Sequence, residues 1–392
     1  MKEWRISSVQ AADEGRRLDV RFQAGSAGHD VYFQSRGDAL TGQAEFLVAA
    51  VLLPAMTTGG VLRIDGEISA RFLANLPAIQ KIYRGWNRSL RPVNVVGCSP
   101  VVRATRPEAR VAAFFSGGVD SFYTLLKHRE EITDLIFVRG FDNIGLDNTA
   151  FYERTSENIR KTASRMGKRI VEIETNLRPF LDACVDWGHF GHGTMLAAVG
   201  HLLSASFRRI YIASAFAYSA LFPWGTHPEL DPLWSSESLE FVHDGCEAAR
   251  VEKVALLATS DAALQNLRVC WNPLRGERNC GRCEKCVRTM INLHVAGALE
   301  RCTTFDSPLD LDRVASMTAE TEGSRTFVME NLRALEGRPA DEALCRSLRE
   351  SLKPPSWSRK LRQYAKRRTA QHPVLQNLLR RGYLRLATFS GR

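Results

Sequence analysis

A buried strand that leads directly into a Gly-Gly turn and a helix is the feature that most restricts the fold of this chain. Residues 111–115 are continuously apolar, as in a parallel strand that is covered on both faces. A helix is predicted from Phe122. The six residues between them are Ser116, Gly117, Gly118, Val119, Asp120 and Ser121. The two glycines permit a sharp turn and a close approach of backbone amides to an anion, so the sequence predicts a phosphate-binding loop.

Alternating strands and helices follow this loop. Strands are expected at 135–138, 169–173 and 209–213, with helices at 155–166 and 194–206. Repeated strand–helix units predict an α/β fold with a doubly wound, mostly parallel sheet. In such sheets, ligands bind beyond the carboxyl ends of the strands.

Four segments are expected along the chain. Residues 1–105 combine short alternating strands with helical spacing and hold no cluster of reactive side chains, so an N-terminal α+β domain with a structural or substrate-shielding role is predicted. Residues 106–300 carry the loop and the strand–helix units. Residues 301–350 are predicted to be a helical extension, and residues 351–392 a basic C-terminal tail.

The net charge of the chain comes from this tail. The whole sequence has a formal charge of +10, but residues 351–392 contain three Lys, eight Arg and no acidic residue, which leaves the remainder near neutral. A solvated or self-docking helix is one interpretation of the tail. The alternative is a non-catalytic contact with an anionic surface, either nucleic acid or membrane lipid. The start of the chain lacks the apolar run of a secretory signal, so a cytoplasmic protein is expected, with a homodimer among the expected assemblies.

Four cysteines form a second motif. Cys270, Cys280, Cys283 and Cys286 follow the spacing C-x9-C-x2-C-x2-C. Four thiolates at this spacing satisfy tetrahedral Zn²⁺, so a small structural zinc subdomain is predicted over residues 270–286. A redox-active pair or an iron–sulfur cluster remains open, because cysteine spacing alone does not separate the metals. Four basic residues lie among or beside the cysteines: Arg278, Arg282, Lys285 and Arg288. They either offset the negative charge of the thiolates, approach the phosphates of a bound nucleotide, or lie in solvent.

The hexapeptide Ser-Gly-Gly-x-Asp-Ser resembles the pyrophosphate loop of the N-type (PP-loop) ATP pyrophosphatases, which have an adenine nucleotide alpha-hydrolase (HUP-like) fold. Together with the cysteine array and Arg288, it is similar to the 7-cyano-7-deazaguanine synthase family. The resemblance implies that the loop binds ATP with Mg²⁺ and that Zn²⁺ is structural. Asp120 and Ser121 of the loop are the candidate catalytic residues; Asp120 either helps to hold Mg²⁺ or the attacking group, or stabilises the start of the helix. It implies a ligase that adenylates the carboxylate of a small-molecule acid and releases pyrophosphate. Ammonia or another nucleophile then displaces AMP.

The chain departs from those synthases in two places. The resemblance assigns Gly193 and Thr194 to nucleotide binding, but they lie in a Gly-His-Gly-Thr sequence where the synthases have a Gly-Arg-Asn turn. The segment 213–244 does not reproduce their base-reading segment, so the acid is left open. A sulfur-transferring or tRNA-modifying enzyme of the same superfamily is the alternative.

Five further residues are weaker candidates. Asp142 follows a predicted strand and is a candidate contact for substrate or Mg²⁺. Arg250 and Lys253, one helical turn apart, either reach the nucleotide or form a solvated face. His189 and His192 either meet a phosphate or substrate, or are satisfied within their own loop.

Overall fold

The computed structural model of the 392-residue chain describes residues 3–142, 145–270 and 279–354. The chain forms two compact units, of which the first is Met1–Leu309 and the second begins at Asp310. The loop, the four cysteines and all other predicted site residues belong to the first unit. Residues 355–392, which hold most of the basic tail, lie outside the described ranges.

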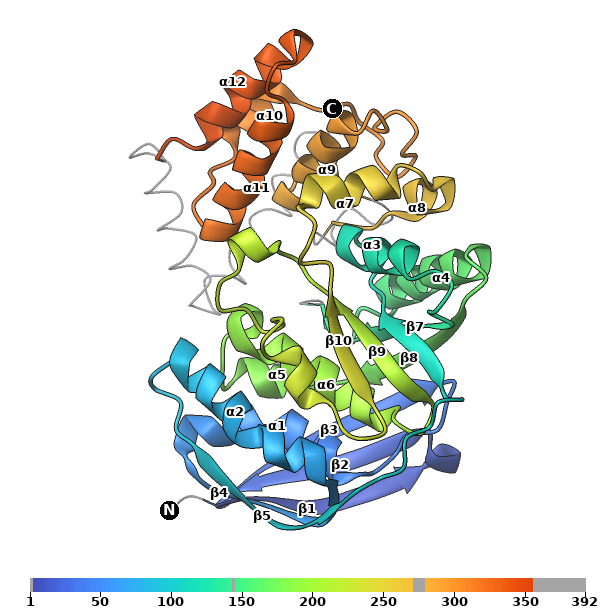
Figure 1. Cartoon of the computed structure of the whole chain (residues 1–392), viewed down its shortest axis with the longest axis vertical. Coiled ribbons are helices and arrows are strands. Elements are labelled where there is room, and N and C mark those ends of the chain that lie inside the picture. Colours follow the sequence, from blue (N-terminus) through green and yellow to red (C-terminus); the bar gives the residue numbers. More distant parts are fainter. Residues whose placement is uncertain (1–2, 143–144, 271–278, 355–392) are drawn as a thin grey trace, which may run out of the picture. The chain divides into compact units, whose positions relative to one another are not determined.

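A single ten-stranded sheet forms the centre of the first unit, in the order β10-β9-β6-β7-β8-β3-β2-β1-β4-β5 (Figure 1). The strands are β1 (Glu3–Ala12), β2 (Arg17–Ala24), β3 (Ala27–Arg36), β4 (Gly60–Ser69), β5 (Val93–Val101), β6 (Arg110–Phe114), β7 (Asp134–Arg139), β8 (Arg169–Thr175), β9 (Phe207–Ala213) and β10 (Glu240–Asp244). The α/β class and the mostly parallel sheet predicted from the sequence are confirmed.

The order of the strands reverses between β6 and β9. From β6 the chain adds β7 and then β8 on one side, whereas β9 and β10 are added on the other side, and all neighbouring pairs among these five strands are parallel. This is the doubly wound arrangement, in which the crevice at the reversal point is the usual ligand site. The Gly-Gly loop follows β6 and therefore starts at that point.

The strands of residues 1–105 continue the same sheet. β3 pairs with β8 in antiparallel register, with Phe33 opposite Thr175 and Arg36 opposite Glu172. Beyond β3, β2 and β1 are antiparallel, and β4 and β5 are again parallel. The N-terminal segment therefore shares its backbone hydrogen bonds with the strands that carry the loop.

Helices cover both faces of the sheet. They are α1 (Ala44–Thr58), α2 (Ala70–Trp86), α3 (Val119–Lys127), α4 (Thr149–Arg165), α5 (Leu177–Asp182), α6 (His192–Leu202), α7 (Arg250–Leu257), α8 (Asp261–Asn266) and α9 (Glu284–Val295). Alternate residues of one strand enter opposite cores: Ala112 of β6 packs with α1 and α6, and Ala113 packs with α3, α4 and α7. Strands covered on both faces are apolar throughout, which explains the continuous apolar run of β6.

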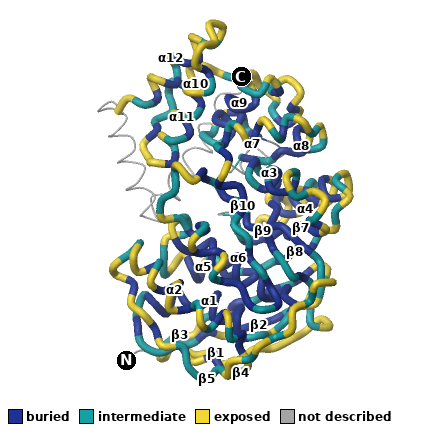
Figure 2. The backbone as a smooth tube through the Cα atoms, viewed as in Figure 1, coloured by how far each residue is buried: buried dark blue, intermediate teal, exposed yellow. Residues whose placement is uncertain are grey.

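Two helices on one face of the sheet, α1 and α6, are buried on nearly every side. The buried residues are 44–56 of α1 and all of α6 (Figure 2). Glu45 is a buried charge in α1; it accepts a hydrogen bond from the amide of Ser69 at 2.6 Å and pairs with Arg103. None of the helices in the described ranges is both long and apolar enough to cross a lipid bilayer.

The second unit contains three helices within its described residues. They are α10 (Leu311–Ser316), α11 (Glu322–Ala334) and α12 (Glu342–Ser351). The amide of Ala319 donates a hydrogen bond to the carbonyl of Ser351 at 3.1 Å, which ties the end of α12 to the segment before α11.

A buried carboxylate fixes the position of α3 against the sheet. Asp244, at the end of β10, accepts hydrogen bonds from Thr124 and Lys127 of α3 and from His128, each at 2.8 Å. Burial opposes ionisation of Asp244, but the hydrogen bonds from Lys127, His128 and Thr124 outweigh it and lower the pKa of the carboxyl below its ordinary value of 3.8. The helix that begins at the loop is thereby joined to the strand on the other side of the reversal point.

Replacing Asp244 with Asn should destabilise the first unit by about 1.5–3 kcal/mol, because the buried carboxylate that accepts from Thr124, Lys127 and His128 is lost, while Lys127 keeps Glu247 as a partner. The native-state pKa of Asp244 is lowered, so its contribution is complete above pH 3.8 and is lost as the pH falls through that lowered value. Denaturant unfolding between pH 3 and pH 7 checks both effects. Asp261→Asn, which removes a carboxylate that is 71% exposed, is the matched control and should change stability by less than about 1 kcal/mol.

Candidate functional site

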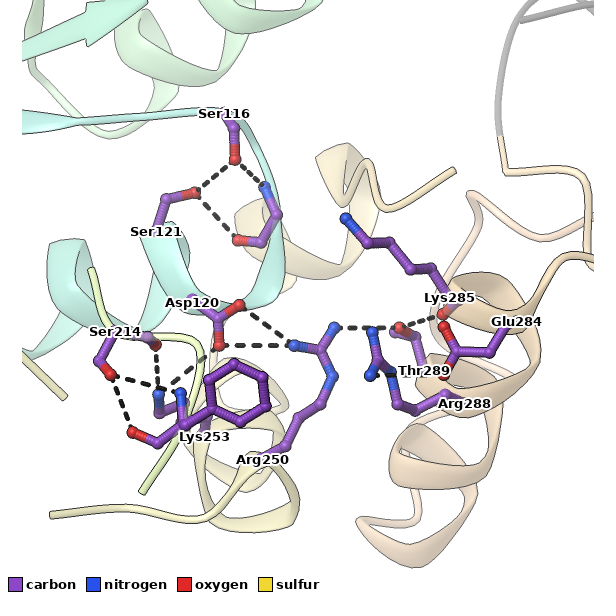
Figure 3. Close-up of polar contacts among 12 residues, drawn as sticks. Ser116, Asp120, Ser121, Ser214, Arg250, Lys253, Glu284, Lys285, Arg288 and Thr289 are labelled. Atoms are coloured by element: carbon purple, nitrogen blue, oxygen red, sulfur yellow. Dashed lines mark hydrogen bonds and ion pairs between the residues drawn. The ribbon is translucent and has the colours of Figure 1, made fainter. Parts of the chain in front are cut away.

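The loop between β6 and α3 has the geometry of an anion site. Gly117 has φ of +74°, a conformation that favours glycine, and Gly118 is the N-cap residue of α3. Gly118 has no side chain to cap the helix, so the first amides of α3 are not capped by that residue. The hydroxyl of Ser116 accepts a hydrogen bond from the Gly118 amide at 3.3 Å, and the Ser121 hydroxyl donates to the Gly118 carbonyl at 3.1 Å. The two hydroxyls lie 3.4 Å apart on the same side of the loop (Figure 3).

Replacing Gly117 with Ala should distort this loop. An added Cβ would stand 3.3 Å from Ile159 Cδ1, and the backbone would remain at a positive φ, which costs a non-glycine residue about 1–2 kcal/mol. The resemblance noted in the sequence implies that this loop binds ATP, and on that expectation the variant should lose about tenfold or more in ATP affinity, measured by isothermal titration. Gly167→Ala, at a positive φ with open space around it, is the control for strain alone and should retain wild-type affinity.

Two buried cations face Asp120 within the loop. Arg250 Nη1 lies 3.2 Å from Asp120 Oδ2, and Lys253 Nζ lies 3.6 Å from Asp120 Oδ1 (Figure 3). Both basic side chains come from α7, where Arg250 is 6% exposed and Lys253 is 1% exposed. Lys253 also donates a hydrogen bond to the carbonyl of Ser214, beyond β9, at 2.6 Å. The interpretation of Arg250 and Lys253 as a solvated face is therefore wrong, because both are buried against Asp120 of the loop. That they reach a nucleotide stays a prediction.

Further positive charge comes from α9. Arg288 is 8% exposed and pairs with Glu284 at 3.4 Å, and Lys285 extends toward the same side of the site (Figure 3). Arg250 Nη2 lies 3.4 Å from the hydroxyl of Thr289, which links α7 to α9. Burial opposes ionisation of Asp120, but the charges of Arg250, Lys253, Arg288 and Lys285 together lower the pKa of its carboxyl. A carboxylate whose pKa is depressed by a group of neighbouring cations marks a region of strong positive potential.

Arg268 is a contact of the loop that the sequence did not indicate. Its amide donates to the carbonyl of Gly117 at 2.8 Å, and its guanidinium lies 3.4 Å from the Ser116 carbonyl. The same guanidinium pairs with Asp142 at 3.0 Å and stacks over the ring of Phe151. Arg268 therefore links Asp142 to the loop, and the contact of Asp142 with substrate or Mg²⁺ stays a prediction. The only sequence signal for Arg268 is its place two residues before Cys270.

The four cysteines lie together as a metal site requires. Their sulfur atoms are all within 4.8 Å of one another, with Cys280 Sγ 3.8 Å from Cys286 Sγ and Cys283 Sγ 3.9 Å from Cys270 Sγ. The amide of Cys283 donates to Cys280 Sγ, and that of Cys286 donates to Cys283 Sγ at the start of α9. Amides directed at sulfur stabilise thiolates, and four convergent thiols suit a tetrahedral ion such as Zn²⁺. The predicted ligand set is thus brought together, while residues 271–278 between its members lie outside the described ranges.

Without a cation these thiols are not all ionised. A hydrogen bond with Cys270 is the largest cause that raises the pKa of Cys283 to about 11. A divalent ion would displace the protons, since thiolates are the binding form of the ligands. Asn279 supports the site: its side-chain oxygen accepts from the amides of Val269 and Cys270, and its Nδ2 donates to the Leu267 carbonyl.

Gly193 and Thr194, predicted to bind the nucleotide, lie away from the loop and from Asp120. They are in the first turn of α6, which packs in the core on the opposite face of the sheet from α3. The Thr194 hydroxyl is fully buried and donates to the Gly191 carbonyl at 2.8 Å. A Cβ on Gly193 would stand 1.7 Å from the carbonyl oxygen of Gly225. Close helix–loop packing therefore explains both residues, and the structure does not bring them to the Asp120 cluster.

The two histidines nearby have partners within their own segment. His192 contacts the Trp187 carbonyl at 3.0 Å and the Thr226 hydroxyl at 3.3 Å, and burial lowers the pKa of its imidazole. His189 is exposed and pairs with Asp186 at 2.8 Å. These contacts favour the interpretation of both as satisfied loop histidines.

Comparisons with protein-family models, with curated proteins and with solved structures found no match to this chain.

Proposed function

We propose that the protein is an ATP-dependent ligase of the PP-loop ATP pyrophosphatase type, with the corresponding adenine nucleotide alpha-hydrolase fold. It adenylates a carboxylate of a small-molecule acid, releases pyrophosphate, and transfers the acyl group to ammonia or another nucleophile. One observation carries the proposal: a glycine loop with an uncapped helix start at the strand reversal point faces the buried cations Arg250 and Lys253. That combination is suited to a polyphosphate whose charge rises during the reaction.

Each group has a role in this proposal. The amides at the start of α3 and the hydroxyls of Ser116 and Ser121 bind the β- and γ-phosphates. Arg250 and Lys253 stabilise the charge that develops on the leaving pyrophosphate, and their burial limits screening by water. Asp120 holds both cations at the loop through its ion pairs. Mg²⁺, bound with ATP, supplies further neutralisation of phosphate charge.

The cysteine site has a supporting role in the same proposal. Zn²⁺ held by Cys270, Cys280, Cys283 and Cys286 would fix the start of α9 and the segment that carries Arg268. Arg268 contacts the loop backbone, and α9 supplies Lys285 and Arg288 to the positive cluster. Metal binding is therefore expected to order two of the segments that surround the phosphates.

Exchange of labelled pyrophosphate into ATP tests the proposal. Full-length, zinc-replete protein is incubated with ATP, Mg²⁺ and a panel of carboxylic acids, and one class of acid should stimulate exchange. Asp120→Ala should lower that exchange by about 10²-fold, because the two buried cations lose the partner that positions them. Asp261→Ala, at an exposed ion pair, serves as control. Protein that neither binds ATP nor forms AMP would contradict the proposal, as would an unimpaired Asp120→Ala variant.

A further inference from the structure

A continuous series of ring contacts joins the two strand ends on either side of the loop. In the sheet, β6 lies between β7 and β9, and the loop follows β6. Phe141 follows β7 and Phe216 follows β9. Six rings, which we call the aromatic arc, run from one to the other: Phe141, Trp187, His192, Trp224, Phe222 and Phe216. The centroids of successive rings lie 4.6–6.2 Å apart, within the range of favourable aromatic contacts.

The aromatic arc lies on the face of the sheet opposite to α3. Phe141 and Trp187 pack against the core that contains α1 and α6, whereas α3 and α7 belong to the other core. His192 is the first residue of α6. The buried cations of α7 and the aromatic arc therefore flank the carboxyl end of β6 from opposite faces. That end of β6 is where a doubly wound sheet binds its ligands.

Both ends of the aromatic arc are joined to the candidate site. Phe141 directly precedes Asp142, which an arginine links to the loop. At the other end, the hydroxyl of Ser214 donates to the carbonyl of Phe216 at 2.8 Å. The carbonyl of Ser214 accepts the hydrogen bond from Lys253 (Figure 3). A ligand on the arc would thus lie beside the groups proposed to bind the phosphates.

Glycines let the tryptophan rings of the arc lie against the backbone. The π-helix η2 (Trp187–Gly191) leads directly into α6, and π-helical turns are frequent at functional sites. A Cβ on Gly188 would stand 2.8 Å from Cη2 of Trp224. A Cβ on Gly191 would stand 3.2 Å from Cε3 of Trp187. Both rings are therefore held in place by close contacts before any ligand binds.

The surface of the aromatic arc is apolar. Four of its rings are half-buried: Phe141, Trp187, Phe222 and Trp224. The imidazole of His192 has both nitrogens engaged, with Nδ1 3.0 Å from the Trp187 carbonyl and Nε2 3.3 Å from the Thr226 hydroxyl. Ligand sites are lined mainly by aromatic and apolar side chains of this kind. A polar heteroaromatic base would lose hydrogen bonds to water there, whereas a hydrocarbon ring has none to lose.

We propose that the aromatic arc binds the body of the acid that the enzyme activates, and that this body is an apolar aromatic ring system. The inference rests on the proposed function, which requires a carboxylate beside the loop. The rings of the acid stack on Trp187 and Trp224, and its carboxylate points toward the carboxyl end of β6. The arc thereby selects the acid, while the loop and the buried cations act on the phosphates of ATP.

The first experiment measures the affinity of full-length, zinc-replete protein for three carboxylates by isothermal titration, with Mg²⁺ and α,β-methylene-ATP present. The probes are 2-naphthoate, which is planar and apolar, decahydro-2-naphthoate, which is apolar but not planar, and orotate, which is planar but polar. 2-Naphthoate should bind at least about tenfold more tightly than either of the others, because stacking adds to the burial of apolar area. No binding, equal affinities, or a preference for orotate or the saturated acid would overturn the proposal.

Variants of the arc locate the binding site. Trp224→Leu should weaken the binding of 2-naphthoate about tenfold and remove its advantage over the saturated acid. Phe222→Leu should weaken it about threefold; this variant keeps Trp224 on η2 and serves as the test where Trp224→Leu does not fold. Trp86→Leu is the matched control, since this half-buried tryptophan contacts Tyr83 and His227 and should leave the affinity unchanged. Wild-type affinity in folded arc variants would show that the acid binds elsewhere.

Pyrophosphate exchange with the same three acids separates this inference from the proposed function. Exchange that 2-naphthoate stimulates, with a half-saturating concentration raised about tenfold in Trp224→Leu, supports both. Exchange that the saturated acid or orotate stimulates equally well overturns the inference and leaves adenylation standing. If no acid supports exchange while 2-naphthoate binds in a manner that depends on Trp224, the proposed function fails and the arc remains a site for aromatic acids. Absence of both binding and exchange overturns both.

Discussion

Replacing Lys253 with Met is expected to lower ATP-dependent pyrophosphate exchange by about 10²–10³-fold, the range found when one preorganised group for transition-state charge is removed. The side chain is 1% exposed and reaches both Asp120 and the Ser214 carbonyl, so its ammonium is held in place before ATP binds. Methionine preserves most of the volume and removes the charge together with the hydrogen bond to the Ser214 carbonyl. The rate of exchange, measured with the acid that best supports it, checks the expected loss.

Controls separate this effect from misfolding. Lys161→Met removes a lysine of α4 whose side chain is 65% exposed and should leave exchange unchanged. Circular dichroism and thermal unfolding of Lys253→Met should show a folded protein, since loss of the cation leaves Asp120 paired with Arg250. A folded Lys253→Met variant with wild-type exchange would show that the buried lysine does not act on the pyrophosphate.

Loss of the metal site is expected to have the second large effect on pyrophosphate exchange. Cys283→Ser should reduce bound zinc from one ion per chain to less than about a tenth, because Cys283 supplies one of the four sulfur atoms that could hold the ion and is also the N-cap of α9. Loss of the ion should unfold the start of α9 and the segment at Arg268, and so abolish pyrophosphate exchange. Elemental analysis, thermal unfolding and exchange measured on one preparation check the three consequences.

Cys184→Ser is the matched control, since this cysteine lies outside the metal cluster and should leave zinc content and activity unaltered. Iron with acid-labile sulfide in place of zinc would contradict a closed structural site and favour the sulfur-transfer alternative. A protein that holds no metal in any preparation would contradict the site altogether.

The fold class could be predicted because its signals are local. β6 and β7 are buried on both faces, and each is separated from the next strand by helical spacing, that of α3 and α4. The junction between β3 and β8 could not be predicted in this way, because it pairs residues about 140 positions apart and depends on register between two separately predicted strands. For the same reason, no local pattern in residues 1–105 indicates that their strands extend the sheet that carries the loop.

In the candidate site, too, the residues of local motifs could be predicted, and those brought together only by tertiary packing could not. The loop and the four cysteines are contiguous motifs, and the structure places each set together. Three basic residues of the site belong to no motif: Arg250, Lys253 and Arg268. A basic residue outside a motif is ordinarily expected to lie in solvent. Their burial arises only when α7 packs against α3 and when the chain returns to the loop before Cys270. Gly193 is the opposite case, a predicted site residue that the structure places elsewhere. A glycine at the start of a helix permits the approach of a ligand, but it equally permits close packing against another backbone segment, which here is Gly225.

The antiparallel junction of β3 and β8 couples the unfolding of residues 1–105 to that of the strands that carry the loop. A strand pair in the interior of a sheet cannot separate without exposing unpaired amides and carbonyls on both strands, which is the template for edge-to-edge aggregation. Residues 1–105 are therefore not a module that can be gained or lost independently of the loop. The position of the loop after β6 therefore depends in part on strands at the far side of the same sheet.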